Sequence, residues 1–326
     1  MSDLGTARLK LATDRITADP EAILTPRTVS TLRTLALSLR PHQWVKNSLL
    51  FGGLIFSRSL SHWDAVSLAV GAFFAFCMAS SAVYLLNDLR DLKEDRMHPV
   101  KRLRPLASGV ISPSIAKAAL MILMISSGIL AFGLGIGFGM TLSIYVLINL
   151  AYSIGLKRVV ILDVMIVALC FVLRAVAGAV VIGVKASAWL ILCTLMMALL
   201  VCFGKRRHEI VLLQANASNH RASLEQYSIQ FLDLMMAISG GAALVTYALY
   251  TMAEETVQRF GSRGLMLTVP FVVYGVFRYL FLVHLRKDGG DPARLLVSDR
   301  PILLNGFLWV SVVCLVLYGN LVWIPW

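Results

Sequence analysis

Long apolar runs constrain the fold of this chain more than any other feature. Nine of them recur along the 326 residues, of which 58% are hydrophobic and only 15% are charged. Each run approaches the length that crosses a bilayer core as a helix, which satisfies its own backbone hydrogen bonds there. We therefore predict an all-α polytopic membrane protein with nine transmembrane helices, at residues 47–61, 65–86, 114–133, 136–154, 160–183, 187–204, 229–251, 265–285 and 302–324.

The loops between the runs differ in charge. Of the 30 Lys and Arg residues, 23 lie before the first run or in alternate loops after it, and 4 lie in the other loops. Basic loops stay on the cytoplasmic side, so we predict a multi-pass protein of the inner (plasma) membrane with a cytoplasmic N-terminus. The net charge of +12 is spread between the runs, which favours contact with the lipid bilayer and indicates no nucleic-acid partner.

Residues 1–38 differ from the rest of the chain because they are polar and include Pro20 and Pro26. Such a segment has little apolar surface to bury. We therefore predict two regions, a partly disordered cytoplasmic extension at 1–38 and a membrane domain at 39–326.

The motif N-D-L-R-D-L-K-E-D, Asn87 to Asp95, directly follows the second apolar run. In a continuing helix, Asp88, Asp91 and Asp95 share one face. Three carboxylates on one face repel one another unless a cation lies among them, and such oxygen ligands suit Mg²⁺ bound together with substrate phosphates. We predict that Asn87, Asp88, Asp91 and Asp95 hold Mg²⁺. An ordinary charged loop is the alternative.

Basic residues flank this motif. Lys101 and Arg104 follow it, and Lys46 and Asn47 begin the first apolar run on the same side of the membrane. Lys and Arg bind phosphate oxygens, so we predict that these four residues bind an anionic substrate. For Lys46 and Asn47, anchoring at the membrane interface explains the sequence equally well.

A second polar group surrounds the start of the fifth run. Tyr152 and Lys157 precede the run, Asp163 lies just inside it, and Arg174 lies deeper. Ionisable residues inside a membrane span are costly and usually face a partner or a ligand. We predict that Asp163 serves catalysis and that Tyr152, Lys157 and Arg174 bind substrate. The alternatives are helix capping by Asp163 and a structural ion pair of Arg174 with a carboxylate.

The sixth run ends in K-R-R-H-E, Lys205 to Glu209. The positive-inside pattern accounts for the basic residues but not for Glu209. In a helix, Glu209 lies one turn beyond Lys205 and Arg206 and can orient either cation. We predict that Lys205, Arg206 and Glu209 bind substrate.

Together these motifs resemble the UbiA superfamily of intramembrane prenyltransferases, over nearly the whole chain after about residue 38. The resemblance rests on N-D-x-x-D-x-x-x-D after a membrane helix, on the nine runs and on the cluster from Tyr152 to Asp163. It implies a UbiA-type helical bundle in which Asp88 and Asp91 serve catalysis through Mg²⁺. The family's second motif is usually D-x-x-x-D, whereas this chain has Y-S-I-G-L-K and then Asp163.

The stretches P-H-Q-W-V-K-N, Y-S-I-G-L-K and G-K-R-R-H-E are similar to the branch of decaprenyl-phosphate phosphoribosyltransferases. That resemblance implies a catalytic domain at 39–326, with 5-phosphoribosyl 1-diphosphate (PRPP) as the phosphoribosyl donor. The acceptor is decaprenyl or another polyprenyl phosphate, and the product serves arabinan (arabinogalactan) synthesis in the cell wall. It further implies that Tyr152 and Asp163 position the ribose or its metal and that phosphates are bound by Lys46, Lys101, Arg104, Lys157, Lys205 and Arg206. A homo-oligomer is left open.

Two other functions fit part of the sequence. One is a UbiA-type enzyme that joins a prenyl diphosphate to an aromatic or other small acceptor, but it predicts a second acidic motif, which is missing. The other is a membrane transporter, whose carboxylates would lie near the middle of the membrane. Here the carboxylates gather at one side.

Overall fold

Helices form the whole described part of this membrane protein. The computed structural model describes residues 31–97, 101–214, 226–285 and 298–319, which contain helices and turns and no strand. Eight helices are long and apolar enough to cross a membrane, which confirms the predicted all-α polytopic fold. They are α4 (Trp63–Arg90), α6 (Pro113–Leu134), α7 (Ile136–Ile154), α8 (Leu162–Val181), α9 (Ala188–Gln214), α10 (Ile229–Met252), α12 (Val269–Leu285) preceded by the 3-10 helix η5 (Gly264–Thr268), and α14 (Arg300–Tyr318).

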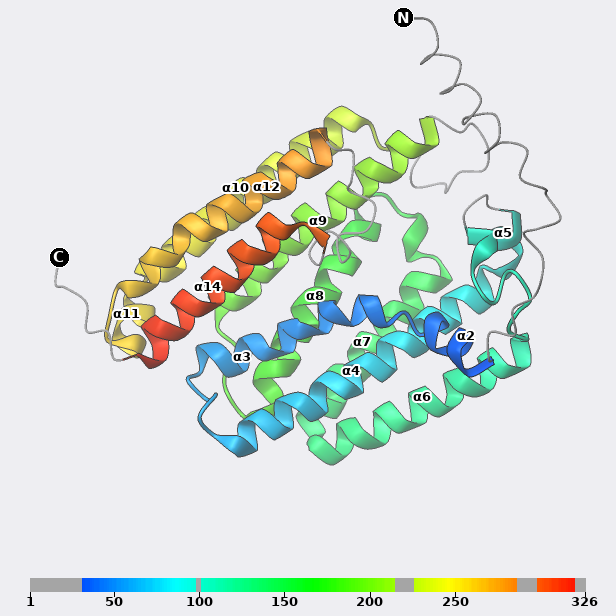
Figure 1. The fold of residues 1–326 in the computed structure, drawn as a ribbon, viewed down its shortest axis with the longest axis horizontal. Helices are drawn as coiled ribbons and strands as arrows, with labels where there is room; N and C mark the ends of the chain where they lie inside the picture. Colours follow the sequence, from blue (N-terminus) through cyan, green and yellow to red (C-terminus); the bar gives the residue numbers. More distant parts are fainter. Residues whose placement is uncertain (1–30, 98–100, 215–225, 286–297, 320–326) are drawn as a thin grey trace, which may run out of the picture.

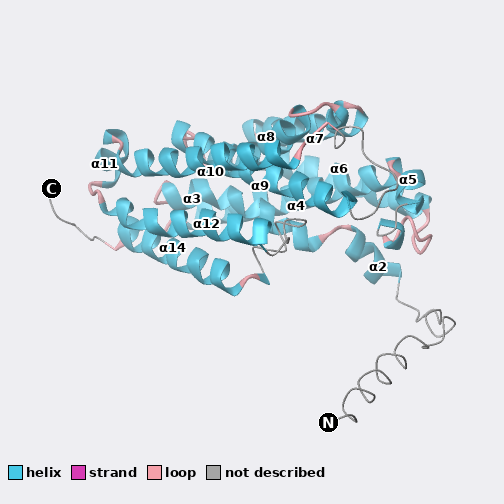
Figure 2. Cartoon of the chain, turned by 90° about the horizontal axis from the view of Figure 1, so that it is seen from above, coloured by secondary structure: helices cyan, strands magenta, loops and turns pink. Residues whose placement is uncertain are grey.

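The long helices run between two ends of one bundle (Figure 1). One end carries the short helices α2 (Thr31–Ser38) and α5 (Leu92–Met97), which Figure 2 also places together. We call it the charged end because the acidic motif lies there. The opposite end carries α11 (Glu254–Phe260) and the tight turn between α6 and α7. Gly135 alone separates those two helices, with a φ of 144° that favours glycine.

The first predicted helix, 47–61, is not a single α-helix in the structure. Pro41–Leu50 is a 3-10 helix, η2, and Phe51–Phe56 is a short α-helix, α3. A 3-10 helix rises about 2.0 Å per residue and an α-helix about 1.5 Å, so these two elements reach about 29 Å, close to the thickness of a bilayer core. The extra rise per residue therefore lets a short run cross where an α-helix of the same length would fall short.

Contacts at its two ends confirm that this first segment crosses the bundle. Before it, Arg40 pairs with Asp88 at the charged end. After it, Arg58 donates a hydrogen bond of 3.0 Å to the carbonyl oxygen of Phe260, at the opposite end. The described residues therefore cross between the two ends nine times, eight of them in long helices.

Glycine allows the first segment to pack against α8. A Cβ atom added to Gly178 would lie 2.0 Å from the carbonyl oxygen of Leu50, and one added to Gly53 would lie 2.9 Å from the backbone nitrogen of Ala179. Small residues let membrane helices approach this closely. The crossing therefore depends on Gly178 lacking a side chain.

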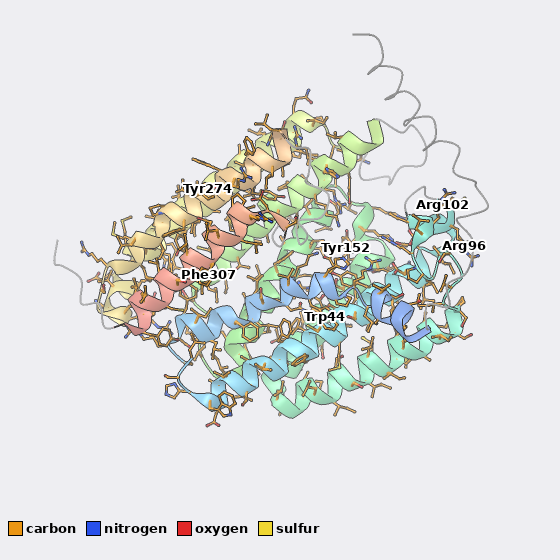
Figure 3. All side chains as sticks on the ribbon, viewed as in Figure 1. Trp44, Arg96, Arg102, Tyr152, Tyr274 and Phe307 are labelled. Carbon is orange, nitrogen blue, oxygen red and sulfur yellow. The ribbon has the colours of Figure 1, made fainter. Side chains whose placement is uncertain are left out.

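The apolar core forms two main clusters that share α8. One cluster joins α4, α7 and α8 around Phe76 and Phe138. The other joins α8, α9, α10 and α12 around Leu200 and Leu282. The outer helices instead expose large apolar side chains, such as that of Phe307, which projects outward in Figure 3. Because α8 is central, polar side chains on it lie inside the protein and not in lipid.

The predicted boundary at residue 38 coincides with the end of α2. Residues 1–30 of the predicted extension lie outside the described residues. Leu35 of α2 packs against a small apolar cluster of Leu106, Ile111 and Ala116. The last part of the extension therefore contacts the charged end of the bundle.

Candidate functional site

The acidic motif lies where α4 ends and α5 begins. The helix breaks at Asp91, the single residue between α4 and α5. Asp88 and Asp95 are buried, with 5% and 3% of their surface exposed, whereas 35% of the Asp91 side chain is exposed. The break therefore separates Asp91 from its two neighbours, which a continuous helix would have placed on the same face.

Two arginines hold the buried carboxylates. Arg104 Nη1 lies 3.1 Å from Asp88 Oδ1 and 2.6 Å from Asp95 Oδ2, so that one guanidinium bridges both side chains. Arg40 Nη2 lies 2.6 Å from the same oxygen of Asp88. Arg40 also has a left-handed backbone conformation, with a φ of 54°, which is uncommon outside glycine and is found at functional positions.

The connection between α7 and α8 closes this group from another side. Lys157, in the 3-10 helix η4 (Leu156–Arg158), lies with Nζ 2.7 and 3.0 Å from the two carboxylate oxygens of Asp91. The Ser153 hydroxyl donates a hydrogen bond to Oδ1 of Asn87. The acidic motif and the predicted second polar group thus meet at one end of the bundle. We call Arg40, Asp88, Asp91, Asp95, Arg104 and Lys157 the acidic cluster.

The predicted Mg²⁺ ligands are paired with cations in this structure. Within the described ranges, no three His, Cys, Asp or Glu side chains lie close enough together to hold a metal ion. The acidic cluster instead balances three carboxylates with three cations. Its oxygen ligands still fit Mg²⁺, which needs only one or two carboxylates beside substrate phosphates. The ion pairs described for Asp88 and Asp95 use one oxygen of each.

Asp163 is the centre of a second network, at the start of α8. Its side chain is fully buried, and the Tyr227 hydroxyl donates a hydrogen bond of 2.8 Å to its Oδ1. The same hydroxyl accepts a 2.6 Å hydrogen bond from the backbone N–H of Ile161. Burial, and then the bond to Asp163, raise the pKa of Tyr227, which keeps the hydroxyl protonated. Ile161 has a φ of 68°, a strained value for a β-branched residue that Tyr227 helps to hold.

Arg206 approaches Asp163 from α9. Its Nε lies 2.8 Å from Oδ2 of Asp163, but the N–H does not point at that oxygen, which has no hydrogen-bond donor among the described residues. The remaining nitrogens donate to Glu209 at 2.5 Å and to the Tyr152 hydroxyl at 3.1 Å. The predicted orientation of Arg206 by Glu209 is confirmed. Arg206 is buried and held on three sides, whereas Lys205 beside it is exposed.

Arg174 and Asn47 lie apart from both groups. Arg174 is eleven residues beyond Asp163 on α8, which is about 16 Å along the helix axis. It donates hydrogen bonds of 2.7 Å to Asn47 Oδ1 and 2.8 Å to the Tyr145 hydroxyl, and its guanidinium also lies over the Tyr145 ring. The partners described for Arg174 are thus neutral groups and not the carboxylate of the structural alternative. Asn47 in turn donates to Ser80 of α4.

The remaining predicted residues include Lys101, Lys46 and Tyr152. Lys101 begins the 3-10 helix η3 (Lys101–Leu103) and is exposed, and Lys46 lies half-buried on η2. Figure 3 places Arg102 at the α5 end of the molecule and Tyr152 toward the middle of the bundle. Lys101 therefore lies at the charged end, whereas Tyr152 belongs to the Asp163 network through Arg206.

Sequence reasoning missed three residues of these networks. Arg40 stands beside the P-H-Q-W-V-K-N stretch, and that position was its only signal. Ser153 follows Tyr152 directly, but a lone serine near a helix end is too common to be a signal. Tyr227 is 64 residues from Asp163 in the sequence, and only the packing of α10 against α9, and of α9 against α8, brings it there.

The fold and the charged end define an intramembrane enzyme of a known class. Residues 48–309 match the UbiA prenyltransferase family, and the chain belongs to that family. The fold is similar to that of a UbiA homolog from Archaeoglobus fulgidus solved with DMAPP and Mg²⁺. The TM-score is 0.64 at 18% identity, over 87% of this chain and 99% of that one.

Two relatives carry a more specific name. The decaprenyl-phosphate phosphoribosyltransferase of Mycolicibacterium smegmatis is 30% identical over 298 residues, which cover 87% of this chain and 92% of that protein. The decaprenyl-phosphate phosphoribosyltransferase of Corynebacterium glutamicum is 32% identical over 289 residues, 86% of each chain. The similarity therefore extends over almost all of both proteins.

Proposed function

We propose that this chain transfers the 5-phosphoribosyl group from 5-phosphoribosyl 1-diphosphate to decaprenyl phosphate, or a related polyprenyl phosphate, and releases diphosphate. The observation that carries the proposal is the one-to-one balance of carboxylates and cations in the acidic cluster. The two relatives named decaprenyl-phosphate phosphoribosyltransferase support it, at about 30% identity over most of the chain. By the same resemblance, the product serves cell-wall arabinan synthesis.

The cations of the acidic cluster fit a phosphoribosyl donor better than a prenyl diphosphate. A phosphoribosyl donor carries a diphosphate and a separate 5-phosphate, and each phosphoryl group brings about one to two negative charges. Arg40 and Arg104 already share the carboxylate of Asp88, and Lys157 pairs with the neighbouring Asp91. Guanidinium groups bind phosphate with the same paired geometry as carboxylate. These three side chains can therefore exchange a carboxylate for a phosphate oxygen when the phosphoribosyl donor binds.

Mg²⁺ is the cofactor that the oxygen ligands of the acidic motif suit. We assign it to Asn87, Asp88, Asp91 and Asp95, and the Mg²⁺ in the similar A. fulgidus protein supports this. When bound, the ion neutralises charge on the departing diphosphate. When Arg40, Arg104 and Lys157 bind phosphate oxygens, their carboxylate partners are released and become available as ligands. Asp91 is the accessible member, since a third of its side chain is exposed.

The Asp163 network is assigned to the ribose side of the site. Asp163 is fully buried and its carboxylate is bound by Arg206 and Tyr227, so we assign it to holding these two side chains on the ribose side. Arg206 is a positioning residue, because Tyr152, Asp163 and Glu209 already occupy its guanidinium. The exposed Lys205 is the cation of α9 that reaches the 5-phosphate, together with Lys46 and Lys101. Asn47 and Arg174 are assigned to holding the first segment, η2, against α8.

The proposed reaction needs no general base from the protein. An oxygen of the acceptor phosphate is already an anion, so it attacks the anomeric carbon without a general base. A new bond forms between that oxygen and the anomeric carbon. The bond from this carbon to the diphosphate breaks, and the diphosphate leaves with the electron pair. The residues contribute positioning and neutralisation of developing charge.

The orientation and the division of the chain belong to the same proposal. We assign the charged end, and the site, to the cytoplasmic side of the inner membrane, and the distribution of basic residues among the loops supports this. Residues 39–326 act as one catalytic membrane domain after an extension at 1–38. The polyprenyl tail then stays in the bilayer while its phosphate reaches the charged end.

Incubation of the purified protein with a radiolabelled phosphoribosyl donor, polyprenyl phosphate and Mg²⁺ tests the proposal. The expected result is label in the lipid extract. A parallel reaction offers prenyl diphosphate and an aromatic acid. Prenylation of the acid, with the phosphoribosyl donor ignored, would replace this proposal with a conventional UbiA prenyltransfer.

A further inference from the structure

A groove with two cations at its mouth lies on the outside of the bundle, between α4 and α6. The two helices pack together, and α6 runs along the edge of the molecule (Figure 1). The groove measures about 510 Å³ and is lined by Leu86, Leu89, Arg90, Lys117, Leu120 and Met121. This volume is in the range of about 300–1,000 Å³ that is typical of small-molecule sites. The function proposed above does not use these residues.

The lining is arranged by depth in the membrane. Arg90 is the last residue of α4, and Lys117 is the fifth residue of α6, so that both lie near the charged end. Leu86 lies one turn deeper than Arg90, and Leu120 and Met121 lie one turn deeper than Lys117. The groove thus has a cationic mouth at the membrane surface and an apolar floor toward the membrane interior.

No acidic side chain balances these cations in the lining. Arg90 donates one hydrogen bond of 3.2 Å, to the carbonyl oxygen of Ile154 at the end of α7, which fixes its guanidinium in place. Lys117 is exposed, and no ion pair is described for it within the described ranges. A guanidinium and an ammonium that line the same groove suit a phosphate group.

The groove faces away from the acidic cluster. Leu86, Leu89 and Arg90 share one face of α4, whereas the buried Asp88 lies on the opposite face, turned into the protein. A lipid in the groove therefore does not present its phosphate to the reaction site. This separates the occupant of the groove from the acceptor of the transfer.

We propose that the α4–α6 groove binds an anionic phospholipid of the leaflet at the charged end, with its phosphate between Arg90 and Lys117 and an acyl chain along Leu86, Leu120 and Met121. Basic pockets between membrane helices on the cytoplasmic side recognise anionic head groups in this way. The lipid bridges the ends of α4 and α6 next to the segment that carries the acidic motif. This binding does not depend on the proposed transfer reaction.

Native mass spectrometry of the full chain in detergent, titrated with phosphatidylglycerol or with phosphatidylcholine of the same acyl chains, tests the proposal. The groove variant is Arg90→Gln/Lys117→Gln. The matched control is Lys93→Gln/Arg96→Gln, which removes one Lys and one Arg from exposed positions of α5 at the same end. Figure 3 shows Arg96 at the α5 end of the molecule, and neither control residue lines the groove.

The groove variant is expected to raise the Kd for phosphatidylglycerol about tenfold or more, and the control less than about twofold, since only the groove provides two charged hydrogen bonds. Phosphatidylcholine should bind all three proteins alike. If the double variant does not fold, the exposed single variant Lys117→Gln carries the test, and Lys117→Arg should restore binding. Equal Kd values for wild type and groove variant would overturn the proposal. So would an unchanged Kd with a shift in oligomeric state, which would mean that a second copy covers the groove.

Discussion

Asp91 differs from Asp88 and Asp95 because it is partly exposed at a helix break and, among the described residues, forms its ion pair with Lys157. Its carboxylate can be changed to the amide of the same shape without unfolding the protein, because a third of the Asp91 side chain is exposed. We predict that Asp91→Asn folds normally and lowers transfer activity by at least about two orders of magnitude, the usual cost of losing stabilisation of a departing charge. EDTA should abolish wild-type activity, and Mg²⁺ should restore it.

The matched control for this experiment is Glu94→Gln, at an exposed position on α5 outside the acidic cluster. It removes the same charge three residues further along the chain and should keep nearly full activity. Wild-type activity in Asp91→Asn, or full activity in EDTA, would remove the metal role from the account.

Lys205 and Arg206 are neighbours on α9 with opposite environments, and the two substitutions should separate binding from stability. Lys205 is exposed, so Lys205→Ala should leave the melting temperature unchanged. It should raise the KM for the phosphoribosyl donor, because one lost charged hydrogen bond weakens the binding free energy by about 1.5–3 kcal/mol. The dependence of activity on Mg²⁺ should stay the same. An unchanged KM would show that Lys205 does not meet a phosphate.

Arg206→Ala should act through the fold. It leaves the buried carboxylate of Asp163 without its cation, and breaking a buried ion pair costs about 3–5 kcal/mol. A clear fall in the thermal unfolding temperature in detergent is the expected result. Normal stability together with a raised KM would instead make Arg206 a direct substrate ligand.

Individual site residues could be predicted only in part, because a sequence shows types and spacing but not partners. The position of the motif after the second apolar run predicted that the carboxylates lie where a membrane helix ends, and α4 ends there, while the i, i+3, i+7 spacing predicted one shared face. It assumed an unbroken helix, however, and the break at Asp91 gave that carboxylate a different partner. Arg174 showed the same limit: its charge was a clear signal, whereas its neutral partners on η2 and α7 depend on packing.

At the scale of elements, the backbone of the first segment contacts the backbone of α8 so closely that the contact leaves no room for a side chain at Gly178. Gly178→Ala would place a methyl group 2.0 Å from the carbonyl oxygen of Leu50. Since that oxygen belongs to the main chain, the segment must shift. We predict that the free energy of unfolding falls by about 1–3 kcal/mol or more. Thermal unfolding of the purified variant measures it.

Gly128→Ala is the control for this prediction. Gly128 lies within α6, and an added Cβ would meet nothing within 4 Å. Alanine favours a helix over glycine by about 0.5–1 kcal/mol, so this variant should be neutral or slightly more stable. Equal effects of the two substitutions would contradict the close crossing.

The helices themselves were largely predictable, because hydrophobic length is a strong signal in a membrane. The run 136–154 coincides with α7, and most other limits agree within a few residues. The 3-10 form of η2 was not predictable, since its reason lies in the distance to be crossed and in the contact with Gly178. α9 also continues past its apolar run through the K-R-R-H-E stretch, which is why Glu209 can reach Arg206.

For the whole molecule, the account requires that the charged end faces the cytoplasm. Ser108 is exposed at that end, and Arg263 is exposed at the other. In a background without the native cysteines, Ser108→Cys should resist a membrane-impermeant maleimide on intact cells, whereas Arg263→Cys should react. Ser298→Cys, exposed just before α14, should behave like Ser108→Cys. Labelling at Ser108 from outside would reverse the orientation.

The central claim is that the phosphoribosyl group passes to the lipid while the diphosphate leaves. A doubly labelled phosphoribosyl donor, with radiocarbon in the ribose and radiophosphorus in the β-phosphate, follows both halves in one reaction with polyprenyl phosphate. The account predicts radiocarbon in the organic phase and an equal amount of radiophosphorus in the aqueous phase as diphosphate, with both signals lost in Asp91→Asn. Radiophosphorus that follows the lipid, or radiocarbon that stays entirely in the aqueous phase with active protein, would contradict it.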